Sequence, residues 1–164
     1  METIKIINSS DYASEHFRFS EWFATSLSPT RKEFECPKCL IQSAEILRAF
    51  FNENWLITSA YRPNDTFGFH RTGNAFDSVP FTPFNRIRII NKFHDECIKY
   101  QQDETSQLIR DLRSVGVQGI GVEPTCVHLD YRNNENCVDT DKYGKYIVFR
   151  WDGKNSTVIY KHKG

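Results

Sequence analysis

The stretch FHRTGNAFDSVP, residues 69–80, places His70, Gly73 and Asp77 at HxxGxAxD spacing. It comes shortly after TSAYRPND, residues 58–65, whose proline, asparagine and aspartate are typical of a turn. Gly73 allows a sharp backbone bend before AFDSV begins a predicted strand. Such a bend can bring His70 and Asp77 to one point, which a straight strand could not do.

A second polar group lies in CVHLD, residues 126–130. Side chains alternate along a strand, so Cys126, His128 and Asp130 share one face, while Val127 and Leu129 point the other way. We therefore expect the polar face to look into a cleft or into solvent.

Together, His70, Asp77 and His128 supply two imidazoles and one carboxylate. This is the ligand set of an open zinc site, which leaves a coordination position for water. Zinc would lower the pKa of that water and polarise a substrate carbonyl. The other histidines, such as His16 and His94, have no such context, and we expect surface or core positions for them.

The remaining segments predict an α+β protein, in which a helical first half leads into an antiparallel meander. Apolar residues recur at helical spacing in three segments, and β-branched and aromatic residues dominate the strands. The expected helices are CLIQSAEILRAFF (39–51), PFNRIRIINKFHDECIKY (83–100) and SQLIRDLRSVG (106–116). The expected strands include Trp55 to Ser59 within NWLITSA, KYIVFRW (145–151) and STVIYK (156–161).

Composition restricts the possible functions. The chain has 164 residues, with 21 basic residues balancing 21 acidic ones, so no overall field attracts it to nucleic acid or to an anionic membrane. We expect one domain over residues 1–164, a monomer, and no membrane insertion. The N-terminal METIKIINSSDYASEH lacks the design of a signal peptide, which predicts a cytoplasmic location on synthesis.

Five cysteines form an odd count for a disulfide framework, and we expect them to be mostly reduced. ECPKC, residues 35–39, contains one CxxC, and a structural zinc site would need a second such pair. The alternative is that Cys36 and Cys39 flank the start of a helix, with Pro37 in its first turn.

Three motifs occur in an order that resembles a known family. They are SAYR at residues 59–62, HRTGNAFD at 70–77 and GIGVEPTCVHLDYR at 119–132. This ordered set resembles the zinc D-Ala-D-Ala carboxypeptidase family, in its small phage and bacterial branch. HFRFSEWFATS, residues 16–26, is similar to the F-x-x-S-E opening of that branch. The resemblance implies the Hedgehog/DD-peptidase-like fold, an antiparallel sheet with helices packed on one side.

The resemblance also implies roles for individual residues. It assigns zinc to His70, Asp77 and His128, and it assigns substrate binding to the SAYR motif. Arg62 of that motif would receive the carboxylate of a peptidoglycan stem peptide, because a planar guanidinium can meet a carboxylate with two hydrogen bonds. Ser59 and Tyr61 would line the same substrate site. The alternative for Arg62 is a turn arginine that is paired at the surface.

Two positions depart from the family pattern. Many members carry serine two residues before the first ligand histidine, where this chain has Gly68. Several branches carry the general-base carboxylate three residues before the last ligand, where this chain has Thr125. The general base must therefore be another carboxylate.

Two carboxylates remain as candidate bases. We favour Asp130, which shares a strand face with His128, and its alternative role is to orient His128. Glu123 would be turned away by regular alternation unless Pro124 introduces a bulge. The neighbouring Cys126 is expected to fill a wall of the cleft, with a thiolate beside zinc as the alternative.

These features predict a zinc metallopeptidase that cleaves peptidoglycan stem peptides as a D,D-carboxypeptidase or an endopeptidase. It would act at the bacterial cell wall, and it could be encoded by a phage as an endolysin. A zinc-containing binding module of the same fold, without catalysis, is the alternative suggested by Gly68 and Thr125. A non-haem iron oxygenase using His128, Asp130 and His162 is disfavoured, because such enzymes usually build on a β-sandwich and this chain shows three helical patterns.

Overall fold

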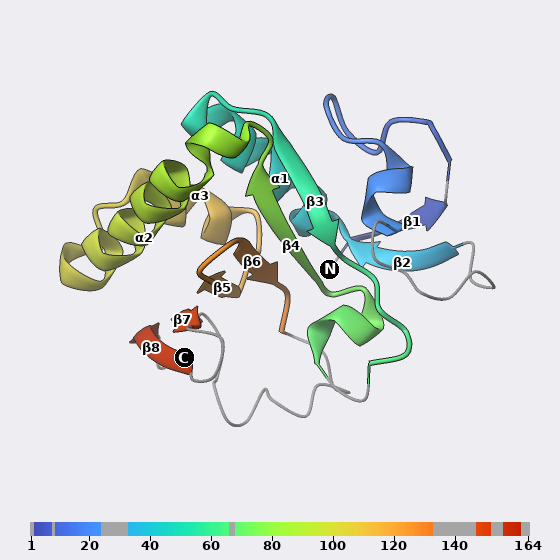
Figure 1. Cartoon of the computed structure of the whole chain (residues 1–164). Helices are drawn as coiled ribbons and strands as arrows, with labels where there is room; N and C mark the ends of the chain where they lie inside the picture. Colours follow the sequence, from blue (N-terminus) through green and yellow to red (C-terminus); the bar gives the residue numbers. More distant parts are fainter. Residues whose placement is uncertain are drawn as a thin grey trace.

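The computed structural model describes residues 2–7, 9–23, 33–65, 68–132, 147–151 and 156–161. Helices pack against β-sheets in this α+β arrangement (Figure 1). The elements are β1 (Thr3–Ile7), η1 (Phe19–Phe23), β2 (Glu33–Pro37), α1 (Lys38–Phe51), β3 (Trp55–Ser59), η2 (Phe69–Thr72), β4 (Ala75–Pro80), η3 (Pro83–Asn85), α2 (Arg86–Asp103), α3 (Gln107–Ser114), β5 (Gly119–Val122), β6 (Val127–Asp130), β7 (Ile147–Trp151) and β8 (Ser156–Lys161), where η marks a 3-10 helix.

The larger sheet has the strand order β3-β4-β6-β5-β7-β8, and β1 and β2 form a separate antiparallel pair. The predicted antiparallel pairing holds for every pair of the larger sheet except β5 with β7, which is parallel. β6 runs antiparallel to β5 and β7 runs in the direction opposite to β6, so β7 lies parallel to β5 along its other edge. The sheet is therefore mixed rather than purely antiparallel.

The helices cover one face of the sheet. The ring of Phe51 at the end of α1 lies 5.7 Å from the ring of Trp55 in β3 and 6.3 Å from that of Phe93 in α2. Trp55 is opposite Pro80 in β4, and alternation along β4 places Phe76 on this same face. Phe76 is paired with Leu129 of β6, and both are fully buried.

The CxxC segment marks the start of α1. Cys36 lies in β2 and Cys39 in the first turn of α1, so the two cysteines flank the helix start as the alternative prediction states. Pro37 is the N-cap residue, and so it lies just before the first turn in which it was predicted. Both are free thiols, and burial raises the pKa of Cys39 to about 11 and that of Cys36 well above its usual range. Within the described residues, neither thiol belongs to a group of side chains that could hold a metal.

Among the described residues, no helix has the length and apolar character that crossing a membrane requires. His162, which the oxygenase alternative would use, lies outside the described residues.

Candidate metal centre

Asp77 and His128 meet because β4 and β6 are paired in register. Asp77 is directly opposite His128, so both side chains project from the same face of the sheet. His128 Nδ1 lies 2.7 Å from Asp77 Oδ1. This face is opposite the one that carries Phe76 and Leu129, because successive side chains alternate. The register thus separates the hydrophobic core from the polar group.

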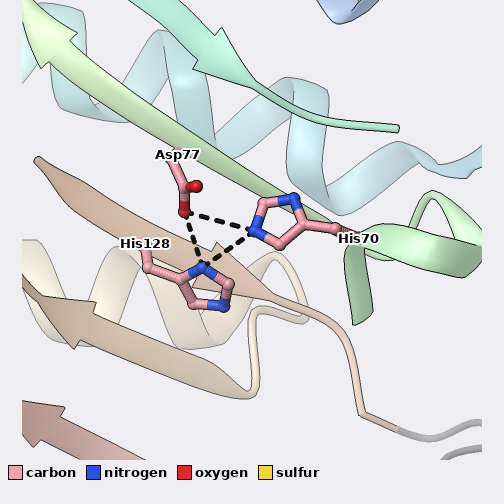
Figure 2. A group of neighbouring side chains, drawn as sticks. All are labelled: His70, Asp77 and His128. Atoms are coloured by element: carbon pink, nitrogen blue, oxygen red, sulfur yellow. Dashed lines mark hydrogen bonds and ion pairs between the residues drawn. The ribbon is translucent and has the colours of Figure 1, made fainter. Parts of the chain in front are cut away.

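His70 reaches the same point from η2, a helix of four residues. The helix ends at Gly73, which has a left-handed conformation with φ of 75°, so this glycine makes the predicted bend. A Cβ atom at Gly73 would also lie 2.5 Å from the ring of Phe34, which leaves no room for a side chain. The bend places His70 Nε2 at 3.3 Å from both Asp77 Oδ1 and His128 Nδ1 (Figure 2).

The three donor atoms fit a small divalent metal. Ligand atoms at tetrahedral zinc, with bonds of 2.0–2.1 Å, lie about 3.3 Å from one another. The two separations that involve His70 have this value. The third, between His128 Nδ1 and Asp77 Oδ1, is 2.7 Å, because these two atoms form a direct hydrogen bond. His70 Nδ1 lies 2.8 Å from the carbonyl oxygen of Ala60, which points Nε2 toward the other two donors. His70, Asp77 and His128 therefore form a group that could hold a metal ion.

The protonation of the group is consistent with a cation site. Burial raises the pKa of Asp77, but hydrogen bonds with His128 and His70 outweigh it and hold that pKa well below its usual range. Burial lowers the pKa of His128, but hydrogen bonds with Asp130 and Asp77 raise it to about 10. In the metal-free protein His128 is therefore protonated and its charge balances that of the ionised Asp77, and a bound metal would displace this proton from His128.

Asp130 lies on the far side of His128 from His70 and Asp77. Its Oδ2 is 3.1 Å from His128 Nε2, and Arg132 donates from Nε to Oδ1 and from Nη2 to Oδ2, both at 2.8 Å. Asp130 is fully buried, and its carboxylate fills the space above Gly119, where a Cβ atom would overlap it. Both oxygens of Asp130 are thus engaged by other side chains.

Glu123 lies closer to the metal group than strand alternation predicts. β5 ends at Val122, and the Glu123 backbone N–H donates to the Cys126 carbonyl across a turn. Cys126 Sγ donates to Glu123 Oε2 at 3.2 Å, and ligand atoms of Asp77, Glu123 and Cys126 lie within 4.8 Å of one another. The turn therefore directs the half-buried Glu123 carboxylate toward Asp77.

Cys126 forms part of the wall beside this carboxylate. It is buried, and its pKa is raised by burial and by the negative charges of Asp77 and Glu123. The side chain is therefore a neutral thiol in the metal-free protein.

The SAYR segment borders the metal group at the end of β3. Ser59 is opposite Asp77 in register and is buried. The Tyr61 ring stacks on that of Phe34 at 4.5 Å and is also buried, so it packs the core beside the site. Arg62 donates its backbone N–H to the His70 carbonyl oxygen, and its Nε lies 3.1 Å from Asp65 Oδ2.

Sequence reasoning did not assign a role to Arg132 or to Phe69. The Arg132 guanidinium lies 4.8 Å from the centroid of the Phe69 ring. Phe69 is the residue before His70 in the chain. The available signal was the pair of opposite charges at Asp130 and Arg132, which are two residues apart in the sequence LDYR.

Neither a family model, nor a curated protein, nor a solved structure matches this chain. The fold and the site therefore define an α+β protein with a buried His–Asp–His group that could hold a metal ion.

Proposed function

We propose that this protein is a zinc metallopeptidase of Hedgehog/DD-peptidase-like fold that cleaves peptidoglycan stem peptides at the bacterial cell wall. The observation that carries this proposal is the convergence of His70, Asp77 and His128 on one point from η2, β4 and β6. The order of the motifs along the chain supports the same family. The reaction is hydrolysis of a peptide bond by a D,D-carboxypeptidase or an endopeptidase.

His70, Asp77 and His128 would hold the zinc ion. When bound, zinc supplies Lewis acidity that polarises the scissile carbonyl and makes water more acidic. Asp77 contributes a negative charge, and the two imidazoles leave part of the coordination sphere to water and substrate. Ala60 and Asp130 hold the outer nitrogens of the two imidazoles, which fixes the orientation of both rings.

Glu123 is the general base in this proposal. Its carboxylate is half-buried beside Asp77, and its one described hydrogen bond comes from the thiol of Cys126. It can take a proton from the attacking water and deliver it to the leaving amine. Asp130 is the poorer base, because it has no exposed surface and donors from Arg132 and His128 occupy its oxygens.

Arg62 binds the substrate carboxylate. Its backbone is hydrogen-bonded to His70, so it lies beside the metal group, and its guanidinium already pairs with the Asp65 carboxylate. A substrate carboxylate would meet the remaining donors of the guanidinium fork.

We expect Arg62→Lys to raise KM about 10–100-fold for a stem peptide that ends in a free carboxylate, with a smaller change in kcat. The basis is the loss of a charge-assisted, two-point hydrogen bond, which contributes about 1.5–3 kcal/mol. Steady-state kinetics on the free acid and on the same peptide amidated at its C-terminus measure the effect. The amidated peptide should show little difference between the two proteins, and Arg71→Lys, on the exposed part of η2, is the matched control.

The proposed function is tested by metal content and hydrolysis together. Purified protein is analysed for zinc, and muropeptides are digested with and without a chelator and examined by mass spectrometry. We expect one zinc per chain and chelator-sensitive release of D-Ala or cleavage of the stem peptide. Zinc without cleavage would instead support the binding module, and protein that takes up no zinc would contradict the metal assignment.

A further inference from the structure

The two imidazoles of the metal group come from elements that are distant in the sequence. His70 lies in η2 and His128 in β6. Their productive arrangement therefore requires that η2 be held in a fixed position against the end of β6. The backbone contributes one such contact, because the Tyr131 N–H donates to the Asn74 carbonyl oxygen at 2.8 Å.

Arg132 contacts the supporting groups of both histidines. On one side it donates two hydrogen bonds to Asp130, whose Oδ2 also faces His128 Nε2. On the other side its guanidinium lies over the ring of Phe69, the residue before His70. A planar guanidinium can do both at once, because its edge forms hydrogen bonds while its face packs on a ring.

The position of Arg132 is itself fixed. Its backbone N–H donates to Gln118 Oε1 at 2.7 Å, and the Gln118 N–H donates to the Asp130 carbonyl oxygen at 2.9 Å. Arg132 is only 3% exposed and Asp130 is fully buried, and Gly119 leaves the space that the Asp130 carboxylate occupies. A buried ion pair adds little net stability over apolar residues of similar size. The specific effect of the Asp130–Arg132 pair is therefore to orient the side chains that it contacts.

We infer that Arg132 is a positioning residue of the metal centre, which orients His128 through Asp130 and holds His70 in place through Phe69. The inference rests on the proposed metal-binding function of His70, Asp77 and His128. In this role the Arg132 side chain connects η2, which carries His70, to β6, which carries His128.

Two variants of the full chain test this role. Arg132→Lys keeps a positive charge beside Asp130 but lacks the planar fork and the stacking face. The double variant Asp130→Asn/Arg132→Gln removes both charges, so that no buried charge is left without a partner. Arg113→Lys is the matched control, because the Arg113 guanidinium also packs on a ring, that of Tyr100, between α3 and α2.

Cobalt(II) is the probe, because its visible absorption reports ligand geometry. We expect both Arg132 variants to bind cobalt about 10–100-fold more weakly than the unaltered protein and to show an altered visible spectrum. Competition with a chelator measures the cobalt affinity. The control should leave the affinity and the spectrum unchanged. Affinity within about threefold of the unaltered protein in both variants, with the same spectrum, would overturn the inference.

A second readout needs no metal. Nitrogen-15 NMR spectra of the imidazole rings in the metal-free protein should shift for His128 and His70 in Arg132→Lys and stay constant in Arg113→Lys. If the unaltered protein binds no cobalt, the proposed function fails, while the ring spectra still test the positioning role. Unchanged ring signals in both Arg132 variants would then contradict it.

Discussion

Replacing His70 with alanine is expected to abolish metal binding and peptide hydrolysis together. His70 Nε2 is the donor that lies at a ligand-like 3.3 Å from both Asp77 and His128. Without it, the remaining two side chains form only the 2.7 Å ion pair between β4 and β6. Since a catalytic metal contributes several kcal/mol of transition-state stabilisation, we expect hydrolysis to fall on the order of 10³-fold or more.

The measurements are zinc per chain by elemental analysis and the rate of muropeptide cleavage. His94→Ala is the matched control, because His94 is a half-buried histidine of α2 outside the metal group. It should retain both zinc and activity. A His70→Ala protein that keeps full activity, with thermal unfolding like that of the control, would disprove the assignment of His70 as a ligand.

Replacing Glu123 with glutamine is expected to lower kcat about 10²–10⁴-fold, which is the usual contribution of a positioned general base. Glutamine preserves the size of the side chain but cannot accept the proton. Glu123 is not among the three proposed ligands, so we expect zinc content and KM to change little. The measurements are kcat, KM and zinc stoichiometry on the same preparation.

Asp130→Asn separates the two candidate bases. Asp130 faces His128 and is fully buried, so its replacement should weaken zinc binding about 10–100-fold before it affects the chemical step. Burial raises the pKa of Asp130, but the charge of Arg132 and the hydrogen bond with His128 lower it overall, which makes Asp130 a weak proton acceptor. If Asp130→Asn instead keeps its zinc and loses kcat, while Glu123→Gln stays active, the roles are reversed.

Local sequence patterns predicted the helices and most strands of the larger sheet. The stripes in residues 39–51, 83–100 and 106–116 correspond to α1, to η3 with α2, and to α3. Their apolar positions repeat at helical spacing because each helix buries one face in the core. By contrast, the β1–β2 pair and the parallel contact of β7 depend on pairing between distant segments, which local periodicity does not encode.

The metal group was predictable because its donors lie at turn and strand positions that obey simple rules. Gly73 indicated the bend, and alternation placed His128 and Asp130 on one face. Alternation could not place the Glu123 side chain, because it applies only within a strand and β5 ends at Val122. The approach of Glu123 to Asp77 depends on the turn before Cys126, which is a property of the folded hairpin.

The three proposed ligands differ in how firmly the fold holds their backbones. β4 and β6 are both internal strands of the larger sheet, so the amide hydrogens around Asp77 and His128 should exchange with solvent only through extensive unfolding. His70 instead lies in a 3-10 helix of four residues, whose local opening requires far less of the structure to come apart. Metal release would therefore begin at His70. The rate of metal release would follow the rate at which residues 69–72 open locally. A mutation that stabilises the sheet would leave the rate of metal release almost unchanged.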